Sequence, residues 1–337
     1  MTDVPCALGL ARKPAGFRQQ PEDFIVTEML GFELTGDGEH LWLKVEKTGL
    51  NTVDVARQLA SLAGVKERDV AYAGLKDRHA VATQWFSLPG KSVAQLPETE
   101  QSGWRILTQL RNSRKLRRGS HRGNQFVITL RDVMIVPDEL AHWQRELTTT
   151  GCPNYFGPQR FGHDGGNLDK AKALFAGTLK AGRHQRGLYL SAARSWLFNQ
   201  VLAQRVSDGT WHRQIAGDVM ALSGSASVFR AETDDATLTA RLASGDIHPT
   251  GPLWGRGDLP TAADAACLES RIAGTLAEFS AGLAATGMTQ ERRPLRVIPE
   301  ALTLAMPEAG QLVVTFSLPR GAFATSVLRE MVQAAGL

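Results

Sequence analysis

A single carboxylate in a polar loop is the residue of this sequence with the clearest capacity for chemistry. The loop covers residues 74–84 and follows a strand-like run at 70–73, and it carries Asp77 between Lys76 and Arg78. Loops on a rigid scaffold are where catalytic groups concentrate. Flanking cations favour the ionised carboxylate and attract an anionic substrate. A turn aspartate with two solvated basic neighbours is the alternative, and these residues alone leave both interpretations open.

A cationic tract follows this loop. The net charge of the chain is only +4, but residues 105–131 contain eight Lys or Arg residues and no Asp or Glu. Clustering of one sign is the expected footprint of a polyphosphate ligand, although charge runs are also common on solvated faces. The tract leads directly into a strand pattern, which favours an ordered surface that binds nucleic acid. We predict that its backbone-binding residues are Arg114, Lys115, Arg117, Arg118 and Arg122.

The composition is that of an ordinary globular protein, with 43% hydrophobic and 21% charged residues in 337. This length indicates two domains. No apolar run approaches the roughly 20 residues of a membrane-spanning helix. The start of the chain lacks the pattern of a secretory signal, and three widely spaced cysteines suit free thiols in a reducing compartment. We therefore expect a cytoplasmic protein.

Several familiar sites are missing from the sequence. It contains no GxxxxGK[ST] phosphate loop and no GxGxxG after a strand. Its eight histidines form no HExxH motif, and no cysteines are paired at metal-binding spacing. The prediction is a protein without a bound metal.

The elements that must position the loop alternate between strands and helices in the first part of the chain. Strands are predicted at 24–30, 41–46 and 126–130, and a helix capped by Asn51 ends at Gly64. The middle is helix-rich, with a helix at 168–175, a longer one capped by Ser191, a helical region at 262–285 and a loop at 245–260. The end returns to a strand at 312–318 and a helix at 325–335.

This order predicts an α/β (α+β) fold in which one domain is inserted into another. A mixed or antiparallel sheet with flanking helices would form from residues 1–150 and 300–337. A helix-rich α/β insertion would cover residues 151–299.

Five further segments, taken together with the Asp77 loop, resemble the TruD family of tRNA pseudouridine synthases. They are PEDFIVTE, RGNQF, PNYFGPQRFG, SAARSWLFN and LPRGAFATSVLRE, which begin at residues 21, 122, 153, 191 and 318. Each motif alone is only moderately specific, but all six occur in the order typical of the family. The resemblance extends from about Phe17 to Met331.

The resemblance implies isomerisation of a uridine to pseudouridine in tRNA, and it points to the uridine at position 13. This reaction breaks the C1′–N1 bond, turns the bound uracil and joins C1′ to C5. The catalytic aspartate of the family matches Asp77, which could add to C1′, add to C6 or act through a glycal. The reaction is redox-neutral, so we expect no cofactor.

The resemblance also carries over several substrate contacts. Phe24 matches a ring that packs against the target nucleotide, and Asn124 matches an amide that pairs with a uracil edge. Phe323 matches an aromatic residue that stacks on the uracil, and Arg18 falls where the family has a basic residue near the aspartate. A core position for Phe24 and a turn amide for Asn124 are the structural alternatives.

Two further contacts are predicted from the positions of cations. Lys76, next to the aspartate, is expected to contact the substrate, and Arg160 is expected to contact an RNA phosphate. Phe156 and Phe161, close to Arg160 in sequence, are expected to be core residues. We expect a monomer with tRNA as its partner. An RNA-binding protein without catalysis and a base-releasing N-glycosylase are the two other functions considered.

Overall fold

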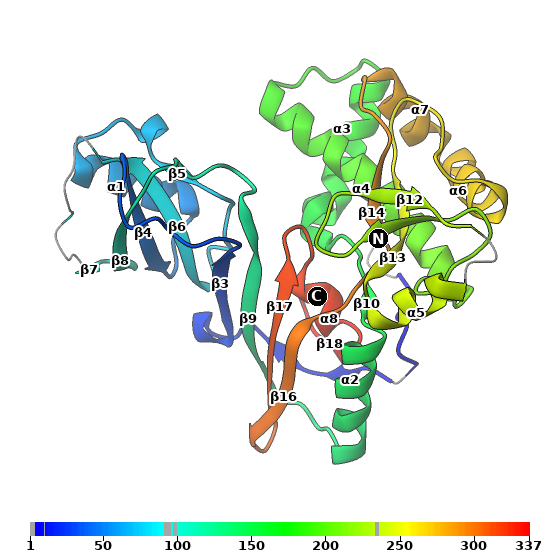
Figure 1. The fold of residues 1–337 in the computed structure, drawn as a ribbon, viewed down its shortest axis with the longest axis horizontal. Helices are drawn as coiled ribbons and strands as arrows, with labels where there is room; N and C mark the ends of the chain where they lie inside the picture. Colours follow the sequence, from blue (N-terminus) through cyan, green and yellow to red (C-terminus); the bar gives the residue numbers. More distant parts are fainter. Residues whose placement is uncertain (1–3, 10, 91–95, 97–99, 233–235) are drawn as a thin grey trace. The chain divides into compact units, whose positions relative to one another are not determined.

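A computed structural model of the chain describes residues 4–9, 11–90, 96, 100–232 and 236–337. These residues form two compact units (Figure 1). The sheet unit comprises Pro14–Val136 and Glu300–Gly321, and the helical unit comprises Met1–Lys13, Pro137–Pro299 and Ala322–Leu337. None of the helices in the described part of the chain combines the length and apolarity needed to cross a membrane.

The sheet unit is built on one large sheet with the strand order β16-β17-β9-β3-β6-β4-β8-β7, with β2 added on β9 and β5 on β6. Of the strand pairs described in it, β3–β6 is parallel and the others are antiparallel. The predicted mixed sheet with flanking helices is therefore confirmed. Its strands are β2 (Gly16–Phe17), β3 (Phe24–Leu30), β4 (His40–Lys47), β5 (Ala71–Tyr72), β6 (Val81–Pro89), β7 (Glu100–Gln101), β8 (Trp104–Asn112), β9 (His121–Arg131), β16 (Glu300–Glu308) and β17 (Gln311–Pro319).

Helix α1 (Thr52–Ala63) covers one face of this sheet. Asn51 and Asp54 form a reciprocal cap at its start, and Gly64 ends it in a left-handed conformation with φ of 65°. The apolar face of α1 includes Val55 and Leu59, both fully buried against β4 and β6. The predicted helix and its cap are confirmed. This packing fixes the start of α1, which contacts the Asp77 loop.

The helical unit combines helices with short strands. Helix α4 packs against α3, α7 and β13 (Figure 1). Its helices are α2 (Pro137–Thr149), α3 (Gly166–Phe175), α4 (Arg183–Ser207), α5 (Ala236–Ser244), α6 (Ala263–Thr275), α7 (Ala277–Ala285) and α8 (Ala324–Leu328). Its strands are β10 (Cys152–Pro153), β11 (Val219–Leu222), β12 (Val228–Arg230), β13 (Ile247–Leu253), β14 (Glu291–Pro294), β15 (Arg296–Val297) and β18 (Val332–Gln333), and β1 (Lys13–Pro14) lies at the sequence boundary between the two units.

Three element predictions in this unit were wrong, and two of them concern its middle part. Helix α4 begins at Arg183, eight residues before Ser191, so that Ser191 lies inside the helix and accepts a hydrogen bond from Arg160 instead of capping. The turns that follow Gly187 bury side chains such as Leu190 and Ala193, and this packing carries the helix through the glycine. The predicted loop at 245–260 contains β13, whose residues 247–252 are all buried between β11 and β14 despite two prolines.

The end of the chain also differs from its predicted helix at 325–335. Helix α8 ends at Leu328, and the chain then turns so that Met331 accepts a hydrogen bond from the Lys13 N–H, at 3.0 Å. The Glu330 carboxylate, 1% exposed, accepts the N–H groups of Ala7 and Leu8. These contacts with the beginning of the chain replace the helical bonds that the sequence pattern favours.

The compact units do not follow the predicted boundaries in three places. The predicted sheet domain included residues 1–13, helix α2 and residues 322–337, all of which pack in the helical unit. The predicted boundaries followed the sequence order of the elements, whereas compactness follows long-range contacts such as Lys13–Met331. The compact units do not test whether residues 151–299 are an inserted domain, so the insertion stays a prediction.

A buried ion pair fixes the start of β3, next to the candidate site. Asp23 is 1% exposed and accepts hydrogen bonds from Arg131 Nη2 at 2.7 Å and Nε at 3.0 Å. It also accepts the Gln20 N–H at 3.1 Å. Burial raises the pKa of Asp23, but the bonds from Arg131 and Gln20 outweigh it, so that the pKa is lowered overall. The pair ties the turn before β3 to β9.

We expect Asp23→Asn to lower the free energy of unfolding by about 1–3 kcal/mol, because a buried charged hydrogen-bond acceptor is lost. Since the pKa of Asp23 is lowered on folding, its contribution to stability is present at neutral pH and is lost as the pH falls through the acid range. Urea unfolding at pH 7 and pH 3 measures both effects. Glu22→Gln, an exposed neighbour, is the control, and an equal loss in that variant would contradict the assignment.

Candidate active site

The Asp77 loop joins β5 to β6 and is held in place from beneath by buried polar side chains. Lys47 Nζ donates to the main-chain carbonyl of Asp77 at 2.6 Å. The Lys76 N–H donates to Thr52 Oγ1 at 2.9 Å, and Thr52 Oγ1 donates in turn to Gln84 Oε1 at 2.8 Å. Lys47, Thr52 and Gln84 are each at most 1% exposed. The loop is therefore fixed by the sheet and by the start of α1, as an ordered loop at a strand end requires.

The Asp77 carboxylate lies at the surface of this support, with its side chain 24% exposed. Its Oδ1 atom accepts the His79 N–H at 3.0 Å, and its Oδ2 atom pairs with Arg18 Nη1 at 2.7 Å. The carboxylate is thus oriented through both oxygens and still reachable from solvent. The predicted proximity of Arg18 and Asp77 is present in the structure.

Arg18 is held in an uncommon backbone conformation, with φ of 58°. Its guanidinium carbon lies 4.1 Å from the centre of the Phe24 ring and 4.9 Å from that of Phe17. Such cation–π contacts, together with the ion pair to Asp77, offset the strain of a left-handed non-glycine residue. Phe24 itself is 5% exposed and stacks edge-on with Phe17 and Phe126. It therefore occupies a core position with Arg18 over its face.

A second group of polar side chains is buried beside the loop. Lys76 Nζ lies 2.9 Å from Glu28 Oε2 and donates to Asn124 Oδ1 at 2.7 Å. The Lys76 and Glu28 side chains are 6% and 0% exposed. Lys76 is engaged in this group rather than presented to a ligand. Because the ammonium requires an acceptor, it fixes the amide orientation of Asn124, whose NH₂ group is left to donate elsewhere.

Sequence reasoning missed two residues of this site, Lys47 and Glu28. Both lie on the buried face of their strands. Lys47 is on the same face of β4 as Leu43 and Val45, and Glu28 is on the same face of β3 as Phe24 and Val26. A charged residue at an apolar position of a strand alternation is the signal that could have found them. Burial lowers the pKa of Lys47 to about 8, an effect opposed by the charge of Asp77 and reinforced by that of Lys76.

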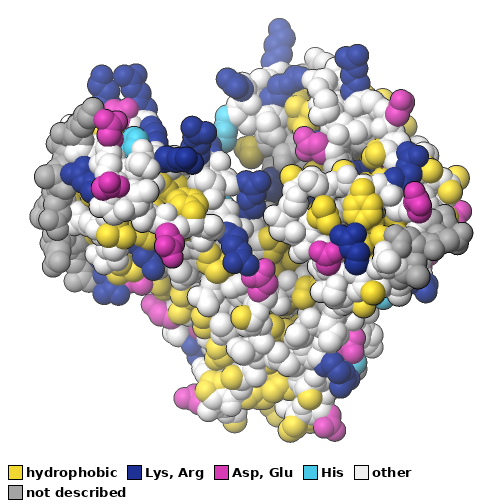
Figure 2. Space-filling model, viewed as in Figure 1, with side chains coloured by type: hydrophobic (Ala, Val, Ile, Leu, Met, Phe, Trp, Pro, Cys, Tyr) yellow, Lys and Arg dark blue, Asp and Glu magenta, His cyan; other side chains and the backbone are white. Residues whose placement is uncertain are grey.

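The middle of the cationic tract, residues 113–120, forms a loop between β8 and β9 that is anchored at one buried residue. Leu116 is 2% exposed and packs with Trp42, and its N–H donates to Ser87 Oγ. The tract residues next to this anchor are exposed, namely Arg114, Lys115, Arg117 and Arg118. Figure 2 shows Lys and Arg side chains grouped along one margin of the sheet unit. Arg122 is exposed as well but is paired with Glu300 at 2.9 Å, so it is a weaker candidate for a phosphate contact.

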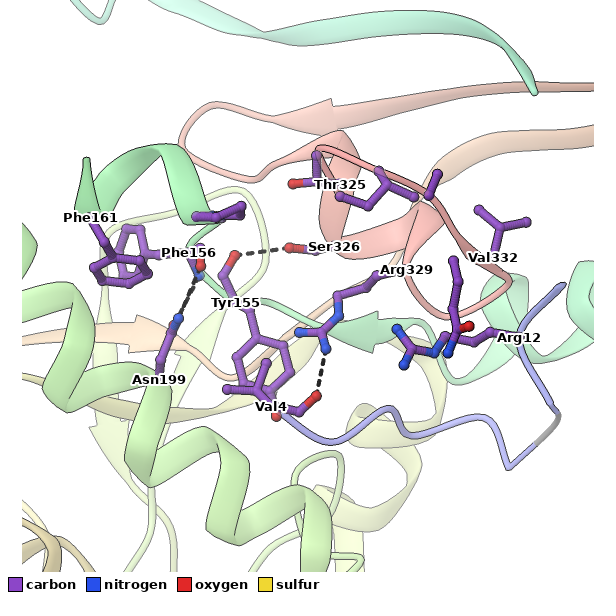
Figure 3. A pocket seen from close by; sticks show the side chains of 15 residues that line it. Val4, Arg12, Tyr155, Phe156, Phe161, Asn199, Thr325, Ser326, Arg329 and Val332 are labelled. Carbon is purple, nitrogen blue, oxygen red and sulfur yellow. Dashed lines mark hydrogen bonds between the residues drawn. The ribbon is translucent and has the colours of Figure 1, made fainter. Parts of the chain in front are cut away.

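The remaining predicted residues, Phe323 and Arg160, lie together in the helical unit. Phe323 immediately precedes α8, and its ring centre is 5.9 Å from that of Phe156. Arg160 lies over both rings, 5.3 Å from Phe156 and 5.9 Å from Phe323. The Asn199 amide accepts a hydrogen bond from the Phe156 N–H and donates one to the Phe156 carbonyl. One of these two hydrogen bonds is drawn in Figure 3. Phe161 is 3% exposed, as a core residue should be.

Figure 3 shows the cavity next to this aromatic group, of about 300 Å³. Ser326 donates to the Tyr155 carbonyl and Arg329 to the Val4 carbonyl along its wall. Phe156 and Phe161 line its other side. The cavity therefore lies where the beginning and end of the chain pack on the PNYFGPQRFG segment. In the described part of the chain, no three His, Cys, Asp or Glu side chains gather closely enough to hold a metal ion.

Comparison with known proteins agrees with these features. The family model described as tRNA pseudouridine synthase D (TruD) matches residues 14–181 and 167–331. The tRNA pseudouridine synthase D of Chromohalobacter salexigens is 48% identical over 98% of this chain and 96% of its own length. That of Methylococcus capsulatus is 47% identical over 98% of this chain and 94% of its own.

A solved structure has the same fold. The crystal structure of a putative tRNA pseudouridine synthase D (TruD) from Methanosarcina mazei superposes with a TM-score of 0.72. It is 21% identical in sequence and covers 98% of this chain and 95% of its own. Since the family model spans nearly the whole chain and the relatives align from end to end, the chain belongs to the tRNA pseudouridine synthase D (TruD) family.

Proposed function

We propose that this protein isomerises a uridine of tRNA to pseudouridine at position 13, with the Asp77 carboxylate as the catalytic group. The observation that carries the proposal is the carboxylate itself, which is solvent-reachable, oriented by His79 and paired with Arg18 at 2.7 Å. The proposal also rests on the membership of the family, whose members carry this activity in their names.

The isomerisation conserves every atom and electron of the uridine. The C1′–N1 bond breaks, the uracil turns, a C1′–C5 bond forms, and the proton that leaves C5 is replaced by one gained at N1. One carboxylate oxygen can add to C1′ or C6, or remove a sugar proton. The Arg18 guanidinium neutralises this oxygen in the resting site. Substrate entry would exchange part of that ion pair for contacts with the sugar and base.

The buried group next to the loop suits recognition of a uracil. Lys76 holds Asn124 so that its NH₂ group can donate to a uracil carbonyl. In this arrangement Lys76 and Glu28 are positioning residues that act through Asn124. Phe24 acts in the same indirect way, because its ring supports Arg18 rather than facing solvent. Phe323 is proposed as the residue that stacks on the uracil, and Arg160 as a phosphate contact, both by family resemblance.

The central test is Asp77→Asn, which keeps the shape of the side chain but removes its charge and nucleophilicity. Proton-transfer roles alone contribute about 10²–10⁴ in rate, and a covalent role adds to that, so we expect no measurable pseudouridine. The affinity for tRNA should stay close to that of the unchanged protein, because phosphate contacts dominate binding. Single-turnover assays and filter binding on the same tRNA measure the two effects.

Asp37→Asn, an exposed aspartate of the same unit, is the matched control and should isomerise normally. Pseudouridine formation by Asp77→Asn at the normal rate would refute the proposed mechanism. Free uracil in the products of the unchanged protein would indicate an N-glycosylase, and binding with no product at all would indicate an RNA-binding protein.

The tract should contribute to RNA affinity without regard to sequence. Arg117→Ala and Arg118→Ala, alone and together, should reduce the slope of log affinity against log salt by about 0.7–0.9 per lost phosphate contact. Arg105→Ala is the control, because Arg105 is paired with Glu46 at 2.7 Å. If the slope changes equally in Arg105→Ala, the effect is one of net charge, and Arg117 and Arg118 make no specific phosphate contact.

The pKa of Lys47, lowered to about 8, predicts a pH dependence of activity. Above pH 8 the buried ammonium loses its proton, and the positive charge that faces the Asp77 carbonyl is lost. We expect the single-turnover rate to fall there. The contribution of Lys47 to stability changes in the opposite direction. Its pKa is depressed on folding from 10.5, so the unfolded chain binds more protons between about pH 8 and 10.5, and this contribution rises with pH.

Unfolding caused by Lys47 would therefore not account for a loss of activity in that range. Lys47→Arg should shift the alkaline limb to higher pH, and Lys47→Met should reduce the rate at every pH. Lys44→Met, on the same strand but less buried, is the control. Thermal melts confirm that each variant folds, and an alkaline limb that stays in place in folded Lys47→Arg would contradict the assignment.

A further inference from the structure

A second cavity, of about 580 Å³, lies within the helical unit and has no place in the proposed reaction. It is formed by the end of α2, the loop of residues 212–216, one face of α5 and β15. Its lining includes the basic residues His212, Arg213 and Arg296, and none of the lining residues that the structure describes is an Asp or Glu. This volume is in the range of small-molecule sites and accommodates a phosphate with its adjoining ribose.

Arg296 gives the cavity a buried positive charge. It is 3% exposed and donates from Nε to His248 Nδ1 at 2.9 Å and from Nη2 to the Leu242 and Ile247 carbonyls. Burial lowers the pKa of Arg296 to about 10, so it stays charged at neutral pH. None of these partners is an anion: two are main-chain carbonyls and the third is an imidazole. Burial, followed by the charge of Arg296, lowers the pKa of His248 to about 4, so this imidazole is neutral at pH 7.

The carboxylates described nearby are already paired with other arginines. Asp218 accepts both terminal nitrogens of Arg205 at 2.9 Å and also the Ile215 N–H. Asp246 pairs with Arg241 at 2.6 Å. Among the described residues, therefore, Arg296 has no carboxylate partner. A buried charge without a counter-ion is costly, and an external anion would remove that cost.

Arg213, also in the lining, adds to the positive potential. Burial, followed by the charges of Arg296, Arg213 and Arg205, lowers the pKa of His212. Three arginines thus act on one imidazole. The buried Nδ1 of His212 has no hydrogen-bond partner in the described structure. A ligand oxygen could supply one.

We propose that this cavity binds a phosphate group of the tRNA backbone, away from the nucleotide that is isomerised. The proposal rests on the proposed function for the identity of the anion. Arg296 supplies a planar guanidinium in a fixed position, Arg213 a second from the rim, and His212 a hydrogen-bond donor. The exposed Arg213 can offer a phosphate two parallel hydrogen bonds from its planar guanidinium. Arg296 can offer only Nη1, because its Nε and Nη2 already donate within the protein.

Thermal unfolding of the full chain tests the anion site, with sodium phosphate compared with sodium chloride at equal ionic strength. Phosphate should raise the melting midpoint of the unchanged protein and of Arg271→Ala, an exposed arginine outside the cavity that serves as the charge-matched control. It should not raise that of Arg213→Ala or Arg296→Gln. A phosphate response that survives Arg213→Ala, or that is missing from the unchanged protein, would overturn the proposal.

Salt titration of tRNA binding tests the source of the phosphate. Arg213→Ala should lower the log–log slope by about 0.7–0.9, the value for one phosphate contact, and Arg271→Ala should not. The single-turnover rate of Arg271→Ala should be unchanged. If Arg213→Ala loses the phosphate response but keeps the slope of the unchanged protein, the cavity binds a free anion and the RNA assignment is overturned. Failure of the proposed function has a different signature, pseudouridine formation by Asp77→Asn, which leaves the phosphate response intact.

Discussion

The burial of charged side chains beneath the Asp77 loop is the constraint on which the site depends. Lys47, Lys76 and Glu28 are almost completely removed from solvent. Charges in such places are costly unless each is paired or hydrogen-bonded. Lys76 and Glu28 compensate each other, and Lys47 is compensated by the carbonyl of Asp77. The loop cannot move without leaving these groups unpaired, so its geometry is set by the sheet beneath it.

This arrangement separates the candidate catalytic carboxylate from the groups that hold the loop in place. Asp77 keeps its carboxylate partly exposed, while its main chain is held by Lys47 and that of its neighbour by Thr52. Preorganised charges and dipoles of this kind contribute much of enzymatic catalysis, because they need no rearrangement as charge develops. Arg18 is the exception, since it faces the carboxylate directly and has to share it with any ligand.

The helical unit handles its buried charges differently. Arg293 is packed on the rings of Phe156 and Phe198 and donates to Asn154, and burial together with the charge of Arg160 lowers its pKa to about 9. Arg296 is held by main-chain carbonyls and a neutral histidine. Neither arginine has a carboxylate partner among the described residues. These two buried arginines therefore rely on aromatic rings, main-chain carbonyls and neutral side chains.

The sequence by itself determined several local elements and pointed to the family. Alternation and capping residues predicted β3, β4, α1 and β17, because these signals depend on neighbours within a few residues. The motif order predicted the family, which the comparisons show, and through it Asp77 as the candidate catalytic residue. Long-range contacts decided the rest: α4 runs through Ser191, β13 forms from a proline-containing segment, and the last helix stops at Leu328. Lys47 and Glu28 stand out in the sequence as charged residues at apolar strand positions, but their place in the site follows from the pairing of β3, β4 and β6. A lysine in a strand has no partner in the sequence, and only tertiary packing determines whether its charge meets solvent or the carbonyl of Asp77.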